Sequence, residues 1–310
     1  MRKHEMRLDR RSFVAASTCC ALSATAIAAP KKHDDLVDEI GITTGSFGRH
    51  FAQQPGEGKL LMLELPKIMR DDLGMRVLDL MTANLPSLKP DYLDKLRAAA
   101  QAADVTITNL KMNQKELDIG SADADIRRHA IDIYKSTIDA AHRLGCRWVR
   151  PLPRTEHPSE KDYVASYREL IDYAGPKGIT LLIENFGWIK DKPDAIPRMI
   201  KAIGDGVDAS VDTGNWTDGA RYEGLAKAYP LAVTCDFKAF ELGADNSHKR
   251  YDLKRCFDIG WKAGFRGPWC FEHFHKELKP LMKEMVRLRD FLTHWKQELQ
   301  RKDDTARSHE

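Results

Sequence analysis

The stretch "ITLLIENF", residues 179–186, decides the fold of this chain. A short apolar run that starts after a glycine and ends in polar residues is typical of a strand buried on both faces. The run follows the helical pattern "EKDYVASYRELIDYAGPKG", which ends at Gly178, and the apolar part of the strand stops at Glu184. A buried strand that follows an amphipathic helix indicates one unit of an alternating α/β fold.

Seven further stretches repeat this pattern from residue 38 onward. With the first, the predicted strands are "EIGITTGSF", "MRVLDLMTA", "VTITNLKMN", "CRWVRPLP", "ITLLIENF", "VDASVDTGNW", "AVTCDFKAF" and "RGPWCFEHF". Eight such units predict a single-domain (β/α)8 TIM barrel over residues 36–299. A doubly wound open sheet is the main competitor, but no strand is followed by G-x-G-x-x-G or a P-loop.

The first 28 residues have the character of an export signal. Arg10 and Arg11 precede a modestly apolar run of small residues, and residues 26–28 form an A-x-A cleavage site. This pattern predicts a twin-arginine signal peptide that is cleaved near Ala28, the twin-arginine export machinery as a partner and a periplasmic mature protein. A retained membrane anchor is the alternative. The apolar run is shorter than the ~20 residues that a span requires, so we expect no stable membrane span.

The charge and cysteine content exclude several classes of function. Residues 1–28 hold five of the 49 basic and two of the 46 acidic residues, so the mature chain has 44 of each. A neutral chain with scattered charges argues against nucleic-acid binding. The four remaining cysteines form no C-x-x-C pair, so we expect buried thiols and no zinc knuckle. The polar residues 300–310 are expected to form a disordered tail.

Four consecutive predicted strands end in carboxylates: Glu184, Asp212, Asp236 and Glu272. Any one of them alone is better explained as a helix cap or a loop ion pair. Because the ends of neighbouring barrel strands converge at the mouth, four together would repel unless a cation neutralised them. Ligands that are all oxygen favour a hard divalent ion.

The segments "LLIENFG", "VDTGNW" and "AGFRGPWCFEHF" resemble the xylose isomerase-like TIM barrels, which include sugar phosphate isomerase/epimerase proteins and ketose 3-epimerases. The resemblance implies one divalent metal ion, Mn²⁺ or Mg²⁺, held by Glu184, Asp212, a histidine of the seventh strand and Glu272. It also implies that Glu184 and Glu272 are the catalytic acid/base pair, which acts through a metal-stabilised enediolate. Barrels of this family often dimerise, so a homodimer is compatible with the resemblance.

The seventh strand departs from the family pattern. The family has H-x-K, and this chain has Asp236-Phe237-Lys238. Asp236 and Lys238 share one face of the strand. Two interpretations remain open. Either Asp236 replaces the histidine as a metal ligand and Lys238 supplies a counter-charge or binds substrate, or the two residues pair with each other.

Four other residues are candidate substrate-binding groups: Asn185, Asn215, Trp216 and His248. The two amides could orient sugar hydroxyls, and Trp216 could stack on a sugar ring or belong to the core. His248 could reach the mouth and replace the missing imidazole, although loop histidines usually face solvent.

The leading prediction is an exported, metal-dependent isomerase or epimerase that removes a proton next to a carbonyl of a small-molecule sugar. The same constellation could instead eliminate a β-oxygen, which would make the protein a 3-keto-glycoside lyase or hydratase. A non-catalytic sugar-binding barrel that has lost its metal is the alternative of another class.

Overall fold

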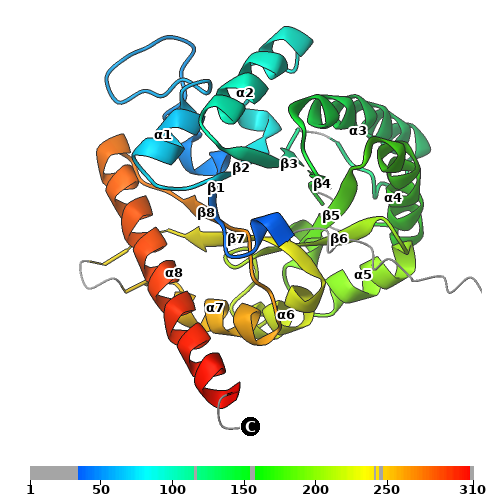
Figure 1. Ribbon diagram of the computed structural model, residues 1–310. Coiled ribbons are helices and arrows are strands. Elements are labelled where there is room, and N and C mark those ends of the chain that lie inside the picture. Colours follow the sequence, from blue (N-terminus) through cyan, green and yellow to red (C-terminus); the bar gives the residue numbers. More distant parts are fainter. Residues whose placement is uncertain (1–33, 115–116, 154–157, 241, 244–246, 308–310) are drawn as a thin grey trace, which may run out of the picture. The chain divides into compact units, whose positions relative to one another are not determined.

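The computed structural model describes residues 34–114, 117–153, 158–240, 242–243 and 247–307. The chain divides into residues 1–34 and 35–310, and the second part forms the barrel. Its eight parallel strands close into a ring in which each strand pairs with the next and β8 pairs with β1 (Figure 1). The strands are β1 Ile40–Thr43, β2 Val77–Met81, β3 Thr106–Met112, β4 Trp148–Pro151, β5 Thr180–Glu184, β6 Val207–Asp212, β7 Ala232–Ala239 and β8 Trp269–His273. The predicted (β/α)8 fold is confirmed, and each strand lies within one of the eight predicted stretches.

Helices follow the strands and surround the barrel (Figure 1). They are α1 Leu65–Asp71, α2 Pro90–Ala102, α3 Ala124–Leu144, α4 Glu160–Ala174, α5 Ala195–Ile203, α6 Arg221–Ala228, α7 Leu253–Lys262 and α8 Leu278–Arg307. Local sequence explains several of their ends. Asp123 caps α3 by accepting hydrogen bonds from the backbone of Asp125 and Ile126, and Gly145 ends it with a φ of 81°.

The barrel interior has two layers, which the two-residue period of the strands produces. The lower layer is a small apolar cluster that contains Val77, Trp148, Leu182 and Cys270. Two residues further along the same four strands the sequence is polar: Asp79, Arg150, Glu184 and Glu272. The carboxyl end of the barrel interior is therefore charged and rests on an apolar floor. The large hydrophobic core lies between the outer face of the strands and the helices.

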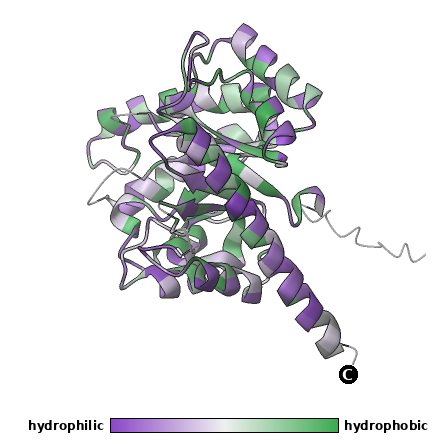
Figure 2. Ribbon diagram, turned by 90° about the vertical axis from the view of Figure 1, so that its left-hand side faces the viewer, coloured by the Kyte–Doolittle hydropathy of each residue, from purple (hydrophilic) through white to green (hydrophobic). Residues whose placement is uncertain are grey.

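The end of the chain differs from the expectation. α8 continues through Arg307, so residues 300–307 are helical where the composition predicts a disordered tail. The second half of α8 is mostly hydrophilic (Figure 2), and its Trp295 and Leu299 pack against the hydrophobic core. The predicted signal peptide lies outside the described residues. Within the described part of the chain, no helix combines the length and the apolar character needed to cross a membrane.

Candidate active site at the barrel mouth

Asp212, the last residue of β6, is held in place from both sides. Its Oδ1 accepts hydrogen bonds from the backbone N–H groups of Gly214 (2.7 Å) and Asn215 (3.0 Å). Asn185 donates to the carbonyl of Asp212 and accepts from its N–H, each at 2.8 Å. Asn185 is fully buried. The nitrogen and the oxygen of its side-chain amide are thus both used to hold the end of β6, and the structure does not turn Asn185 toward a substrate as the sequence suggested.

Glu184, the last residue of β5, has a cation and an amide as neighbours. Its Oε1 accepts a hydrogen bond from Asn215 Nδ2 at 2.8 Å, and its Oε2 lies 2.6 Å from Nε of Arg150 on β4. Both charged side chains are buried. An ion pair inside the barrel stabilises the charged form of both groups, but it does so against a large desolvation cost.

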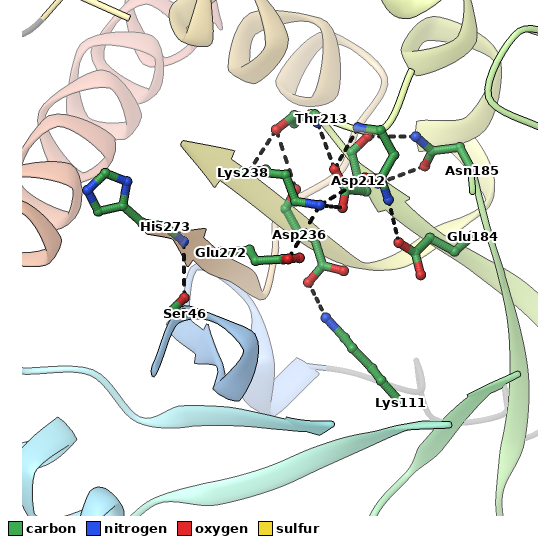
Figure 3. A network of polar contacts seen from close by, with 12 residues as sticks. Ser46, Lys111, Glu184, Asn185, Asp212, Thr213, Asp236, Lys238, Glu272 and His273 are labelled. Carbon is green, nitrogen blue, oxygen red and sulfur yellow. Dashed lines mark hydrogen bonds and ion pairs between the residues drawn. The ribbon is translucent and has the colours of Figure 1, made fainter. Parts of the chain in front are cut away.

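Asp236 pairs across the barrel with a residue that the sequence analysis did not single out. Its Oδ1 accepts a hydrogen bond from Nζ of Lys111 on β3 (Figure 3). Lys111 Nζ also lies 3.6 Å from Asp79 Oδ2 on β2. Thr108 donates to Asp79 Oδ1 at 2.6 Å. All of these side chains are fully or almost fully buried. The alternative in which Asp236 pairs with Lys238 is therefore not what the structure shows.

Lys238 instead joins three other residues of the mouth. Its Nζ lies 2.8 Å from Asp212 Oδ2 and 3.4 Å from Glu272 Oε1, and it donates a hydrogen bond to Asn215 Oδ1 at 2.8 Å. In the register of β7 and β8, Lys238 lies directly opposite Glu272. Figure 3 shows this ammonium group between the carboxylates of Asp212 and Glu272.

Burial and crowding of like charges shift the protonation of these groups. Burial raises the pKa of Glu272 to about 7, Lys238 opposes the shift, and Asp212 and Asp236 add to it. Burial also raises the pKa of Glu184, against the effect of Arg150, and that of Asp212, against the effect of Lys238. Burial disfavours the charged form of Lys238, but the carboxylates of Asp212 and Glu272 outweigh it and raise its pKa. Lys238 is therefore a permanent cation beside carboxyl groups that hold protons unusually well.

Three of the four predicted metal ligands come together. One oxygen from each of Glu184, Asp212 and Asp236 lies within 4.8 Å of the other two. Among the described residues, Asp236 Oδ2 has no polar partner, whereas Glu184 Oε2 and Asp212 Oδ2 already lie 2.6 and 2.8 Å from the cations of Arg150 and Lys238. Buried carboxylates that lie this close together repel one another unless enough positive charge neutralises them. These three residues therefore fit a hard divalent ion, and Glu272 lies outside their group.

The charges of the mouth support the same conclusion. Five carboxylates face three cations, so the formal net charge is −2 when all are ionised; they are Asp79, Glu184, Asp212, Asp236 and Glu272 with Lys111, Arg150 and Lys238. One dication would neutralise the mouth.

Two further candidates do not reach the carboxylates. Trp216 is buried in the hydrophobic core, where its ring lies over Gly224 of α6. His248 receives a hydrogen bond from the backbone N–H of Phe240 at 3.3 Å, and its Nδ1 lies 2.9 Å from the Tyr251 carbonyl. Burial lowers the pKa of His248. Trp216 is thus a core residue, and His248 fastens its own loop rather than replacing the missing imidazole. Asn215, in contrast, lies between Glu184 and Lys238 in the mouth.

Sequence reasoning missed Lys111 and Asp79, which each interrupt an apolar strand. Both stand inside predicted strands, in "VTITNLKMN" and "MRVLDLMTA", where a buried charge needs a partner. That signal was available for both residues, but the identity of the partner was not.

Comparison with known proteins places the chain among barrels of one kind. Residues 71–294 match the sequence profile of the family described as "Xylose isomerase-like TIM barrel". No curated protein matches the chain significantly.

Solved structures are similar over most of the chain. A D-psicose 3-epimerase from Clostridium cellulolyticum H10, solved with D-tagatose, is 15% identical with a TM-score of 0.64, covering 83% of this chain and 98% of that one. A D-allulose 3-epimerase from Methylomonas sp. is 15% identical with a TM-score of 0.64, covering 84% and 98%. A xylose isomerase-like TIM barrel protein from Mycobacterium smegmatis, solved in complex with magnesium, is 19% identical with a TM-score of 0.58, covering 83% and 97%. At these identities the likeness shows the fold alone.

Proposed function

Because the chain belongs to the xylose isomerase-like TIM barrel family, we propose that it is a metal-dependent sugar isomerase or epimerase. The observation that carries this proposal is the convergence of Glu184, Asp212 and Asp236, which are buried and bring one oxygen each within 4.8 Å of the other two. These three residues would hold a divalent ion such as Mn²⁺ or Mg²⁺. Bound there, the ion would supply positive charge next to the oxygens of a sugar, which acidifies the neighbouring C–H bond.

Glu272 has the properties of a group that takes up and returns a proton near neutral pH. A pKa of about 7 gives comparable populations of its acid and base forms at that pH. Lys238 Nζ is 3.4 Å away and remains charged, so it can donate a hydrogen bond to a substrate oxygen. We assign Glu272 to one face of the reacting carbon.

Glu184 is the partner that we assign to the opposite face. Asn215 and Arg150 fix its two oxygens, and burial raises its pKa. In the proposed reaction one glutamate removes the proton from the carbon next to the carbonyl, and a proton returns to the same carbon or its neighbour. The first outcome is epimerisation and the second is isomerisation, and neither needs a further reactant.

The test measures the metal content of the protein and its exchange of substrate protons with solvent. The mature protein is dialysed and analysed for metal, and ketoses are incubated with it in D₂O while NMR follows loss of the C–H signal. We expect stoichiometric metal and exchange in the wild type, and loss of exchange in Glu184→Gln and Glu272→Gln. Glu223→Gln, on the exposed face of α6, is the matched control and should behave as wild type.

The outcomes separate the alternatives. If both variants retain stoichiometric metal and full C–H exchange, the assignment of the site to these residues is wrong. Cleavage of a 3-keto-glycoside without epimer formation would identify a lyase. A protein that binds sugar but retains no metal and exchanges no proton would be a binding barrel.

We also propose that residues 1–28 direct twin-arginine export to the periplasm, as Arg10, Arg11 and the A-x-A sequence before Ala29 suggest. Replacing both arginines by lysine should keep the uncleaved precursor in the cytoplasm. Cell fractionation and the mass of the mature N-terminus test this, and unchanged export of the variant would contradict it.

A further inference from the structure

A cavity of about 620 Å³ lies among loops at the carboxyl end of the barrel, where the mouth also lies. Its walls come from Glu284 of α8 and from three loops: Arg49 after β1, residues around Phe240 and Arg250 after β7, and the segment from Phe274 to Glu277 after β8. Phe240 and Phe274 follow Lys238 and Glu272 by two residues, which corresponds to ~7 Å along a strand. The cavity therefore adjoins the residues to which we assign the chemistry.

The lining of this cavity carries an excess of positive charge. It contains four cations and two carboxylates, a net charge of +2 with His275 neutral. One of the carboxylates, Glu284, is already bonded to His273 Nε2 at 2.5 Å. Within the described part of the chain, Arg49, Arg250 and Lys276 have no ion-pair partner. A concave surface with excess charge of one sign concentrates its field and attracts ions of the opposite sign.

Aromatic rings fix the position of one of these cations. The rings of Phe240 and Phe274 stack at a centroid distance of 6.0 Å, and the Arg250 guanidinium lies 3.8 Å from the centroid of Phe240. Stacking on a ring restrains the planar guanidinium without using its N–H donors. Arg250 is exposed, so those donors are available to a ligand. Loops after the seventh and eighth strands are also a common place for anion binding in TIM barrels.

We infer that this cavity binds an oxyanion group of the substrate, so that the sugar carries a carboxylate or a phosphate ester. The inference rests on the proposed function of the neighbouring mouth. The sugar ring occupies the mouth, and its anionic substituent lies between Arg250, Arg49 and Lys276 against the Phe240 and Phe274 rings.

Calorimetry with three probes tests the inference: D-glucuronate, D-glucose 6-phosphate and neutral D-glucose, at constant ionic strength because exposed charges are screened by salt. We expect at least one acidic probe to bind about tenfold or more tightly than glucose, as a hydrogen-bonded charge pair permits. The stronger acidic probe identifies the carboxylate or the phosphate as the source. Arg250→Met should remove most of this preference, and Lys276→Met should reduce it.

Arg255→Met is the matched control, because Arg255 stacks on Tyr222 at 3.7 Å in the same way but does not line the cavity. It should keep the full preference for the acidic probe. The inference is wrong if the affinity of the wild type for both acids is within about twofold of its affinity for glucose. It is also wrong if Arg255→Met loses as much of the preference for the acidic probe as Arg250→Met does.

The binding readout keeps this inference separate from the proposed function. Preference for acids without C–H exchange on any ketose would support the cavity and contradict the isomerase. Exchange on neutral ketoses without preference for acids would contradict the cavity and leave the isomerase supported.

Discussion

The carboxylate of Asp236 has two different surroundings on its two oxygens. Oδ1 meets the ammonium of Lys111, and Oδ2 has no hydrogen-bond donor among the described residues. Lys111 is itself fully buried and has Asp79 as its second anionic neighbour. Burial alone would lower the pKa of Lys111, but Asp236 and Asp79 outweigh it and raise the pKa. The pairing uses one oxygen of Asp236 and leaves the other for a cation.

Asp236→Asn should therefore weaken metal binding more than Lys238→Met does. Asp236 contributes to the group of three carboxylates, whereas Lys238 contributes positive charge that a metal must overcome. We expect a loss of about tenfold or more in Mn²⁺ affinity for Asp236→Asn, measured by calorimetry on folded protein. A larger loss of Mn²⁺ affinity in Lys238→Met than in Asp236→Asn would show that Asp236 pairs with Lys111 and does not bind a metal.

The raised pKa of Glu272 predicts how the metal-free protein responds to pH. The carboxyl has a pKa of 4.5 in its ordinary state and about 7 in the fold, so between these values the folded state holds the proton more firmly. Stability should then fall as the pH rises from about 5 to 7.5, by about 2 kcal/mol for this group.

Urea unfolding of the chelated protein at the two pH values measures this change. Glu272→Gln should flatten the dependence, and Glu223→Gln should not. An equal slope in wild type and Glu272→Gln would show that the carboxyl titrates normally.

At the scale of elements, the contact between α7 and the barrel depends on a glycine. A Cβ on Gly260 would lie 2.8 Å from the Trp269 ring and 2.9 Å from the Tyr229 ring, which are both buried. The helix packs this closely because only a hydrogen atom separates it from the two rings. The close approach brings α7 against β8, the strand that carries Glu272.

Gly260→Ala should therefore destabilise the fold, although alanine is the better helix former. Overpacking against rigid rings costs about 1–3 kcal/mol and exceeds the gain in helix propensity of ~1 kcal/mol. Gly175→Ala is the control, because nothing lies within 4 Å of its Cβ position. Urea unfolding compares the two variants with wild type, and an unchanged or increased stability of Gly260→Ala would contradict the predicted clash.

The strands and helices also show how much of the structure can be predicted from local sequence. Each of the eight strands lies inside a stretch that the alternating pattern predicts, because a buried parallel strand must be apolar over its own length. The same local rules placed Glu184 and Asp212 at the last positions of β5 and β6. They failed for the end of α8, since a polar composition does not prevent a helix that has already started from continuing.

For the whole molecule, the formal charge of −2 in the mouth predicts that a divalent ion stabilises the fold. An ion that binds the folded state alone adds about 2.7 kcal/mol at one hundred times its dissociation constant. Thermal unfolding of the chelated protein with and without Mn²⁺ should show this as a higher Tm. Asp212→Asn, which removes one of the three carboxylates, should abolish the increase, and an equal increase in both proteins would place the ion elsewhere.

The barrel, its strand order and the strand ends at which carboxylates meet can all be predicted from the sequence. These features follow from hydrophobic period and chain order, which are local or nearly local properties. Only the tertiary structure decided which charges face each other. Lys111 and Asp236 are 125 residues apart and meet across the interior of the closed barrel, and Lys238 turns to Asp212 and Glu272 rather than to Asp236 on its own strand. This is because a buried charge pairs with the opposite charge that lies nearest to it in the folded interior, and closure of the barrel sets those distances.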